Sequence, residues 1–325
     1  MTDGPRVGAA VDLGSNSVHL LIASIDGHRL RPLADESVFL GLGSAVDARA
    51  HLGRTARAEL TAALARYADR ARALGATHVT FLGTEPIRRA ADAGHVVKEV
   101  GTGTGVPLHV LSHEEEAYLT VIGVTGGWPV EEETLVIDIG GGSSEFCVVG
   151  PDGTPRASGL RLGSGRLSSR WVSTDPPTPA AIEHMRAAAD EVLRGAPDAS
   201  PSSVVAVGGT ASNLLKVTPG GVEDQALTRE RISQVLDTLL SMPAADLTER
   251  YYINPKRGPL LPAGAVIVEA LMRRYEVDSV RVSEAGIREG AVLAADHAGR
   301  AWRDHLATLA HGWRTADEGR VPTTS

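Results

Sequence analysis

Three short turns rich in glycine and hydroxyl residues follow apolar segments of this 325-residue chain, at 14–17, 140–144 and 208–210. Glycine has no Cβ, so the backbone N–H groups of such turns can approach an anion closely. Hydroxyls add further donors. The sequence contains neither a Walker A lysine nor a GxGxxG motif opening a helix, so no P-loop or Rossmann site is expected. The pattern predicts phosphate-binding turns, whose residues are Gly14, Ser15, Asn16, Ser17, Gly140, Gly141, Gly142, Ser143, Ser144, Gly208, Gly209 and Thr210.

Two aspartates, Asp12 and Asp138, stand just before the first two turns, inside otherwise apolar segments. A carboxylate in such a place is costly unless it is paired, hydrogen-bonded or bound to a metal. Two interpretations remain open at this stage. Each carboxylate either accepts hydrogen bonds from the amides of its own turn or binds a hard cation such as Mg²⁺, directly or through water.

Two glutamates extend this acidic set. Glu145 directly follows the second turn, and strand alternation places it on one face with Cys147, which we expect to be a core residue. Glu116 ends a run of three glutamates. Ser112 and Glu115 have capping-box spacing, so acidic residues in this run also have a structural explanation. Glu116 projects about 100° away from Glu115 and could activate a water molecule.

Arginines would supply the positive charge, because guanidinium groups suit phosphate oxygens. Arg88 and Arg257 are the best candidates, although a single arginine in this arginine-rich sequence is more often a surface residue. The histidines His19, His109 and His113 show no zinc-binding spacing and are interpreted as ordinary.

The elements that position these residues repeat along the chain. Apolar segments at 7–13, 18–25 and 30–40 predict a hairpin and a third strand, with a turn at Asp26-Gly27. The pattern recurs at 135–139 and 145–149 with a turn at Asp152-Gly153. The offset is 126 positions in each case, from 12 to 138 and from 26 to 152. This shared register predicts two homologous halves, each opening with a hairpin.

Strand and helix patterns alternate after each hairpin and predict an α/β fold. The expected boundary between the halves lies near 123–133. The predicted elements are a helix from Thr55 to Gly75, a strand at 78–84, a helix at 87–100, a strand at 106–112, a helix at 113–123, a helix from Thr178-Pro179, a strand at 204–210 and a helix opened by Thr228.

The amino-acid composition and charge exclude several classes of protein. The formal net charge of −8 argues against a general nucleic-acid binder, so no DNA partner is expected. Net charge describes the whole surface, and one cleft can still bind a polyanion. The single cysteine excludes an internal disulfide framework. Apolar runs are too short for a membrane span and no signal peptide is evident, so we expect a cytoplasmic protein without a membrane partner.

Seven segments together resemble the exopolyphosphatase/guanosine pentaphosphate phosphohydrolase family, the Ppx/GppA phosphatases. The resemblance covers nearly the whole chain and runs through these segments: AAVDLGSNSVHLLIA at 9–23, FLGTEPIRRA at 81–90, LSHEEEAYLTVIGV at 111–124, VIDIGGGSSEF at 136–146, LRLGSGRL at 160–167, AVGGTASNL at 206–214 and VSEAGIREG at 282–290. One departure is Asp92, where relatives often carry asparagine. This change places a charge near the expected anion path and predicts a weaker substrate contact there.

The resemblance implies two RNase H-like domains of the actin/Hsp70/sugar-kinase (ASKHA) superfamily with an interdomain cleft. The expected units are 1–124 and 125–299, with a C-terminal helix at about 300–314 packing on the first unit and a mobile tail at 315–325. It also implies Glu116 as general base, Glu145 as a second catalytic carboxylate and metal ligand, and Asp138 as a metal ligand. Asp12 and the three turns would line the phosphate sites, and Arg88 matches the family arginine. Mg²⁺ or Mn²⁺ is the implied cofactor.

The resemblance implies hydrolysis of the terminal phosphoanhydride of polyphosphate, with guanosine pentaphosphate as the alternative substrate. The length of the chain favours short polyphosphates, because long relatives carry extra C-terminal helical domains. An acceptor-dependent kinase or ATPase of the same superfamily and a non-catalytic phosphate sensor are further alternatives. The intact pair of Glu116 and Glu145 argues against the sensor. A homodimer is the family-level expectation.

Overall fold

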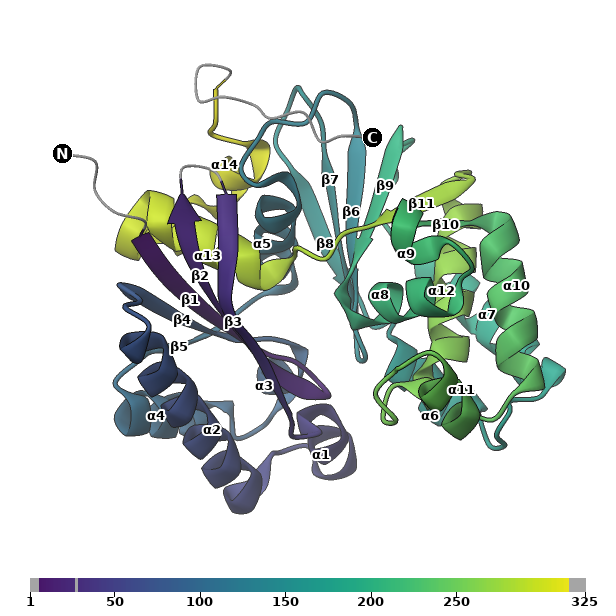
Figure 1. Ribbon diagram of the computed structural model, residues 1–325, viewed down its shortest axis with the longest axis horizontal. Coiled ribbons are helices and arrows are strands. Elements are labelled where there is room, and N and C mark those ends of the chain that lie inside the picture. Colours follow the sequence, from purple (N-terminus) through teal and green to yellow (C-terminus); the bar gives the residue numbers. More distant parts are fainter. Residues whose placement is uncertain (1–5, 27–28, 316–325) are drawn as a thin grey trace.

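The computed structural model describes residues 6–26 and 29–315, and its strands form two sheets (Figure 1). The first sheet has the order β3-β2-β1-β4-β5, and the second has the order β10-β11-β9-β6-β7-β8. The strands are β1 (Arg6–Leu13), β2 (Ser17–Asp26), β3 (Arg29–Phe39), β4 (His78–Gly83), β5 (Leu108–Val110), β6 (Thr134–Ile139), β7 (Ser144–Val149), β8 (Arg156–Leu160), β9 (Ser203–Val207), β10 (Ala226–Thr228) and β11 (Ser279–Val282).

Both sheets are built on the predicted repeat. In each sheet, the first strand pairs antiparallel with the second strand, and the second pairs antiparallel with the third. On its other side the first strand pairs with a parallel strand, which is β4 in the first sheet and β9 in the second. The register is also the same. Asp12 lies opposite His19 in the first hairpin, and Asp138 lies opposite Glu145 in the second. The homologous hairpins predicted from the sequence are therefore confirmed.

Helices cover the faces of both sheets (Figure 1). They are α1 (Leu42–Arg49), α2 (Gly53–Ala73), α3 (Glu85–Arg89), α4 (Ala93–Thr104), α5 (His113–Thr125), α6 (Ser164–Trp171), α7 (Pro179–Leu193), α8 (Gly208–Val217), α9 (Gly221–Asp224), α10 (Arg229–Ser241), α11 (Ala244–Arg250), α12 (Leu261–Arg274), α13 (Ile287–Ala298) and α14 (Leu306–His311), with 3₁₀ turns at Gly258–Leu260 and Gly299–His305.

Two predicted elements differ from the structure. The helix expected at 87–100 is divided into α3 and α4, because the chain becomes extended at Ala90. The strand expected at 204–210 ends at Val207, and α8 begins at Gly208, whose φ of +90° suits glycine. The third glycine turn is therefore the start of a helix and not a hairpin turn.

The interpretation of Asp92 as a charge near the anion path is wrong. Its carboxylate accepts hydrogen bonds from the backbone N–H groups of Leu52 (2.9 Å) and Gly53 (3.1 Å), where α2 begins, and pairs with Arg57 at 2.7 Å. Burial alone would raise the pKa of Asp92, but these hydrogen bonds lower it to about 2. Asp92 thus anchors the start of α2, and it is not among the residues that line the cavity described below.

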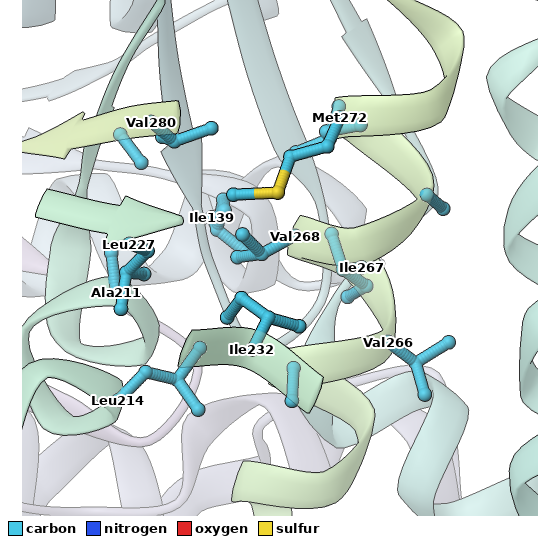
Figure 2. Packing of buried hydrophobic residues seen from close by; sticks show 14 of the residues in the cluster. Ile139, Ala211, Leu214, Leu227, Ile232, Val266, Ile267, Val268, Met272 and Val280 are labelled. Atoms are coloured by element: carbon cyan, nitrogen blue, oxygen red, sulfur yellow. The ribbon is translucent and has the colours of Figure 1, made fainter. Parts of the chain in front are cut away.

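Three cores hold the elements together. One lies between the first sheet and the helices α2 and α4. A second lies between the second sheet and helices that include α12 (Figure 2), where Ile139 and Val280 of the sheet pack near Val268 and Met272. The third contains residues of both sheets, α5, α13 and α14, including Ala10, Val136 and the buried Cys147. Cys147 is a core residue, as predicted, and burial raises the pKa of its thiol to about 12.

The crossing of α5 and α13 is unusually close. A Cβ on Gly123 would lie 2.0 Å from the carbonyl oxygen of Gly286, and a Cβ on Gly290 would lie 1.8 Å from that of Leu119. Glycine at both positions is required for this contact. The predicted second unit, 125–299, includes α13, yet this helix packs against α5, β1 and β4. Helix α14 also packs against α5.

Some sequence predictions fall outside the described residues, namely Gly27 of the expected Asp26-Gly27 turn and positions 316–325 of the expected mobile tail. Within the described ranges, the structure holds no helix with the length and apolar character needed to span a membrane.

Candidate active site

The three predicted turns meet at one cavity of about 510 Å³, which receives side chains from both sheets. The first turn comes from the β1–β2 connection, the second from β6–β7 and the third from the start of α8. The cavity is lined by these predicted residues: Asp12, Gly14, Ser15, Asn16, Ser17, Glu116, Asp138, Gly140, Gly141, Gly142, Ser143, Glu145, Gly208, Gly209, Thr210 and Arg257. Of the predicted site residues, only Ser144 and Arg88 are outside this lining.

The four carboxyl groups predicted from the sequence, those of Asp12, Glu116, Asp138 and Glu145, all line this cavity. Burial and the nearby Glu145 raise the pKa of Asp138 to about 8. Burial raises the pKa of Asp12 to about 7, although Arg288 opposes the shift. The pKa of Glu116 is raised well above its ordinary value by burial and by Glu145, against the opposing effect of Arg88. The cluster therefore strongly favours any positive charge that enters it.

Glu116 is presented by the first turn of α5. Ser112 caps this helix, and its hydroxyl and backbone N–H exchange hydrogen bonds with Glu115, as the predicted capping box requires. Glu115 also pairs with Arg303 and so has a structural role. Glu116 lies on another side of the helix, where it is buried and lines the cavity.

Glu145 is held by two donors on a single oxygen. The Ser143 hydroxyl donates to Oε1 at 2.6 Å, and His113 Nδ1 lies 2.8 Å from the same atom. His113 was interpreted from the sequence as ordinary, so its contact with the site was missed. Helical spacing was the available signal, because residues three apart lie on the same side of a helix and His113 precedes Glu116 by three positions.

Arg88, a predicted phosphate-binding residue, is not among the residues that line the cavity. Its guanidinium contacts the Glu116 carboxylate, donates to the Leu111 carbonyl at 2.6 Å and lies 4.0 Å from Glu145 Oε1. Because two buried carboxylates need a counter-charge, the arginine is engaged behind them instead of in the cavity. Arg257, in contrast, does line the cavity. It packs against Gly209, where an added Cβ would lie 2.0 Å from Nη1.

Ser144 also differs from its prediction. Its side chain is fully buried, and its hydroxyl donates to the Leu162 carbonyl at 2.7 Å. The hydroxyl therefore joins β7 to the segment after β8 and does not face the cavity.

Glu85, which the sequence did not single out, connects the first two turns. Its carboxylate accepts from Ser15 at 3.1 Å and pairs with Arg89 at 2.8 Å and Arg166 at 3.0 Å. It also lies against Gly142, because a Cβ there would be 2.7 Å from Oε2. A second cavity of about 360 Å³ adjoins this cluster and shares Ser15, Asn16, Glu85, Gly141 and Gly142 with the first.

The two aspartates fit a divalent cation better than the alternative. Within the described residues, neither accepts a hydrogen bond from its own turn, and the buried Asp12 Oδ1 has no hydrogen-bond partner. The same residues contain no group of three side chains arranged as a complete metal site. Mg²⁺ takes one or two carboxylates and completes its shell with water and phosphate oxygens. This set of oxygen donors therefore fits Mg²⁺.

Comparison with known proteins defines the class of this fold and site. The chain is 30% identical over 298 residues to exopolyphosphatase 1 of Mycobacterium leprae, covering 87% of each protein. It is 31% identical over 301 residues to exopolyphosphatase 1 of Mycobacterium tuberculosis, covering 87% of the chain and 86% of the relative. Crystal structures of a Ppx/GppA family member from Aquifex aeolicus and of an exopolyphosphatase from Cytophaga hutchinsonii share the fold, each with a TM-score of 0.80. The Aquifex aeolicus protein is 24% identical, and the match covers 91% of this chain and 99% of that one. The Cytophaga hutchinsonii protein is 21% identical, and the match covers 90% of this chain and 98% of that one.

The fold is thus of the expected α/β class, with two mixed sheets and a cavity lined by residues from both, and it is shared with solved structures of the Ppx/GppA family. Residues 21–297 match the Ppx/GppA phosphatase family, and the chain belongs to this family.

Proposed function

We propose that this protein is an exopolyphosphatase, which hydrolyses the terminal phosphoanhydride of inorganic polyphosphate and releases orthophosphate. One observation carries the proposal: three glycine-rich turns and four carboxyl groups line the same cavity. The relatives named exopolyphosphatase support the choice of substrate.

The turns and Arg257 would hold the terminal phosphates. Backbone amides at Gly14, Gly140 and Gly208 belong to turns without bulky side chains, and the hydroxyls of Ser17 and Thr210 add donors. These groups and Arg257 counter the substrate charge locally, which is how a chain with a net charge of −8 can accept a polyanion. In phosphoryl transfer, such positioning and charge stabilisation account for most of the acceleration.

Glu116 would act as the general base. It takes a proton from a water molecule as that water attacks the terminal phosphorus in line, and the bridging oxygen leaves with the shortened chain. The raised pKa of Glu116 makes its carboxylate a stronger proton acceptor near neutral pH. Its contact with Arg88 favours the charged form that accepts the proton and fixes the direction of the carboxylate.

Asp12, Asp138 and Glu145 would hold Mg²⁺ or Mn²⁺, one or two of them as direct carboxylate ligands and the others through water molecules. A bound divalent cation neutralises charge on the phosphate oxygens and helps to orient them. The raised pKa values of Asp12 and Asp138 are consistent with this role, because they reflect burial of the two carboxyl groups together with repulsion from Glu145, and a cation would offset both effects.

Replacement of Glu116 tests the proposal. Glu116→Gln keeps the shape of the side chain and should lower kcat for phosphate release by roughly 100-fold or more, with little change in substrate binding. The matched control is Glu114→Gln, because Glu114 lies in the same helical turn but is exposed. An almost wild-type rate for Glu116→Gln would exclude this residue as the base.

The substrate is tested by measuring phosphate release from polyphosphates of defined length beside guanosine pentaphosphate, with Mg²⁺ present. Faster release from polyphosphate supports the proposal. Faster release from guanosine pentaphosphate, turnover only with an added acceptor, or binding without hydrolysis would each contradict it.

A further inference from the structure

His113 occupies a distinct place beside the candidate catalytic carboxylates. It is the first residue of α5, and its ring lies between Arg88 and Glu145. Nδ1 is 2.8 Å from Glu145 Oε1, while Nη2 of Arg88 is 3.0 Å from Nδ1 and 3.3 Å from Nε2. Since Arg88 also contacts Glu116, one continuous set of contacts joins Glu116, Arg88, His113 and Glu145.

The second sheet contains a position that accommodates this ring. Gly159 of β8 pairs with Glu145 of β7, and a Cβ on Gly159 would lie 2.3 Å from His113 Cγ and Nδ1. Any larger residue at position 159 would therefore occupy the space of the imidazole. The fit of the ring against Gly159 places Nδ1 next to the carboxylate on the neighbouring strand.

Both hydrogen bonds to Glu145 are made to Oε1, one from the Ser143 hydroxyl and one from His113. Within the described residues, no hydrogen bond is made to Oε2. Glu145 is 4% exposed and lines the cavity. Fixing one oxygen from behind leaves the other to act toward water, metal or substrate.

We propose that His113 is a positioning residue that keeps Glu145 oriented during turnover. This inference rests on the proposed function. Ser143 belongs to the second phosphate turn, and when its hydroxyl turns to a substrate phosphate, Glu145 loses that donor. His113 is outside the turn and keeps its contact with Oε1. The carboxylate then stays in the same orientation as the substrate binds, as expected for a ligand held by an outer hydrogen bond.

The paired variants His113→Leu and His113→Asn test this role. Leucine removes the donor, whereas the asparagine amide places an N–H close to the position of Nδ1. We expect His113→Leu to lower kcat for tripolyphosphate hydrolysis about 10- to 100-fold with little change in KM. His113→Asn should recover most of the loss. His184→Leu, an exposed histidine on α7, is the control for general effects of removing a histidine.

Gly159→Ala provides an independent variant that leaves His113 in the chain. The new Cβ would displace the ring, so kcat should fall as in His113→Leu. The two effects should not add in the double variant, since residues acting through one contact are not independent. Thermal unfolding shows whether each variant is folded. If only one of His113→Leu and Gly159→Ala is folded, its kcat tests the positioning role.

The outcomes separate this inference from the proposed function. If the wild-type protein releases no phosphate from tripolyphosphate or longer chains, the proposed function fails. If the wild type is active but folded His113→Leu or Gly159→Ala keeps its kcat, the positioning role fails and the proposed function stands. Equal losses in His113→Leu and His113→Asn would also overturn the role, because they would show that the donor is irrelevant.

Discussion

The first and second hairpins share a backbone but differ in chemistry. A hydrogen bond from Gly14 N to Ser17 O (3.1 Å) closes the first turn, and the equivalent bond from Gly140 N to Ser143 O (3.0 Å) closes the second. In each hairpin an aspartate on the first strand faces one residue on the return strand. That residue is His19 in the first hairpin and Glu145 in the second.

The surroundings explain why these two positions differ. Helix α5 packs against β7 and β8 and brings His113 and Glu116 to the second hairpin. The first hairpin instead has Arg288 of α13 near it. Burial, Arg288 and Arg257 lower the pKa of His19 to about 4, so its ring is neutral at pH 7. The comparison shows how a repeated hairpin can keep its glycine turn in both copies while only the second has a glutamate opposite its aspartate, to which α5 adds Glu116.

The largest expected effect is a difference in kcat between substitutions at the two equivalent positions, Glu145 and His19. Glu145→Gln should lower kcat for polyphosphate hydrolysis about 100-fold or more, because it removes a charge proposed to act on water or metal. His19→Gln should lower kcat less than about 10-fold, because it replaces one neutral group by another. Steady-state phosphate release at saturating Mg²⁺ measures both. Losses of equal size would mean that the two hairpins contribute alike, against the asymmetry inferred here.

A smaller effect is expected in the pH dependence of stability. The pKa of His19 is about 4 in the folded protein and 6.5 ordinarily. The contribution of His19 to the free energy of unfolding is therefore fully present above pH 6.5. It is lost as the pH falls from 6.5 to 4. The loss amounts to at most about 3 kcal/mol. Urea unfolding of the metal-free wild type and of His19→Gln should show their difference in unfolding free energy changing over this interval. A constant difference would show that His19 does not titrate as described.

The smallest effect concerns the contact that joins the two hairpins. Glu85→Gln leaves Arg89 and Arg166 without a buried carboxylate and should reduce the free energy of unfolding by about 1–3 kcal/mol. KM for polyphosphate should rise, because Ser15 and Gly142 lose a shared contact. Asp47→Asn is the control, since Asp47 also pairs with Arg89 but is 60% exposed. An unchanged KM would mean that the turns are aligned independently of Glu85.

Features determined by local sequence were predictable. The two hairpins, their register and the lining of the cavity follow from glycine turns between apolar segments, and the structure agrees at Asp12, Asp138 and Glu145. The capping box at Ser112 was predictable for the same reason, because its two hydrogen bonds span only three residues.

Features determined by packing between distant segments were not predictable. His113 and Glu145 are 32 positions apart, and Glu85 and Arg166 are 81 apart. Only the folded arrangement of α5 with β7, and of α3 with α6, brings these residues together. The contacts of Arg88 with Glu116 and Glu145 have the same origin, because the sequence neighbours of Arg88 do not reveal that two buried carboxylates lie within reach.

The close approach of α13 to α5 also has a consequence for the order in which the protein can assemble during synthesis. The core beneath α2 and α4 uses residues no later than Val110, so it can close early. The opposite face of the first sheet is covered by α13, which begins at Ile287. During synthesis, all strands of the second sheet therefore emerge before α13 is available to cover this face of β1. The sheet whose strands are synthesised first is therefore the one whose second face is covered last.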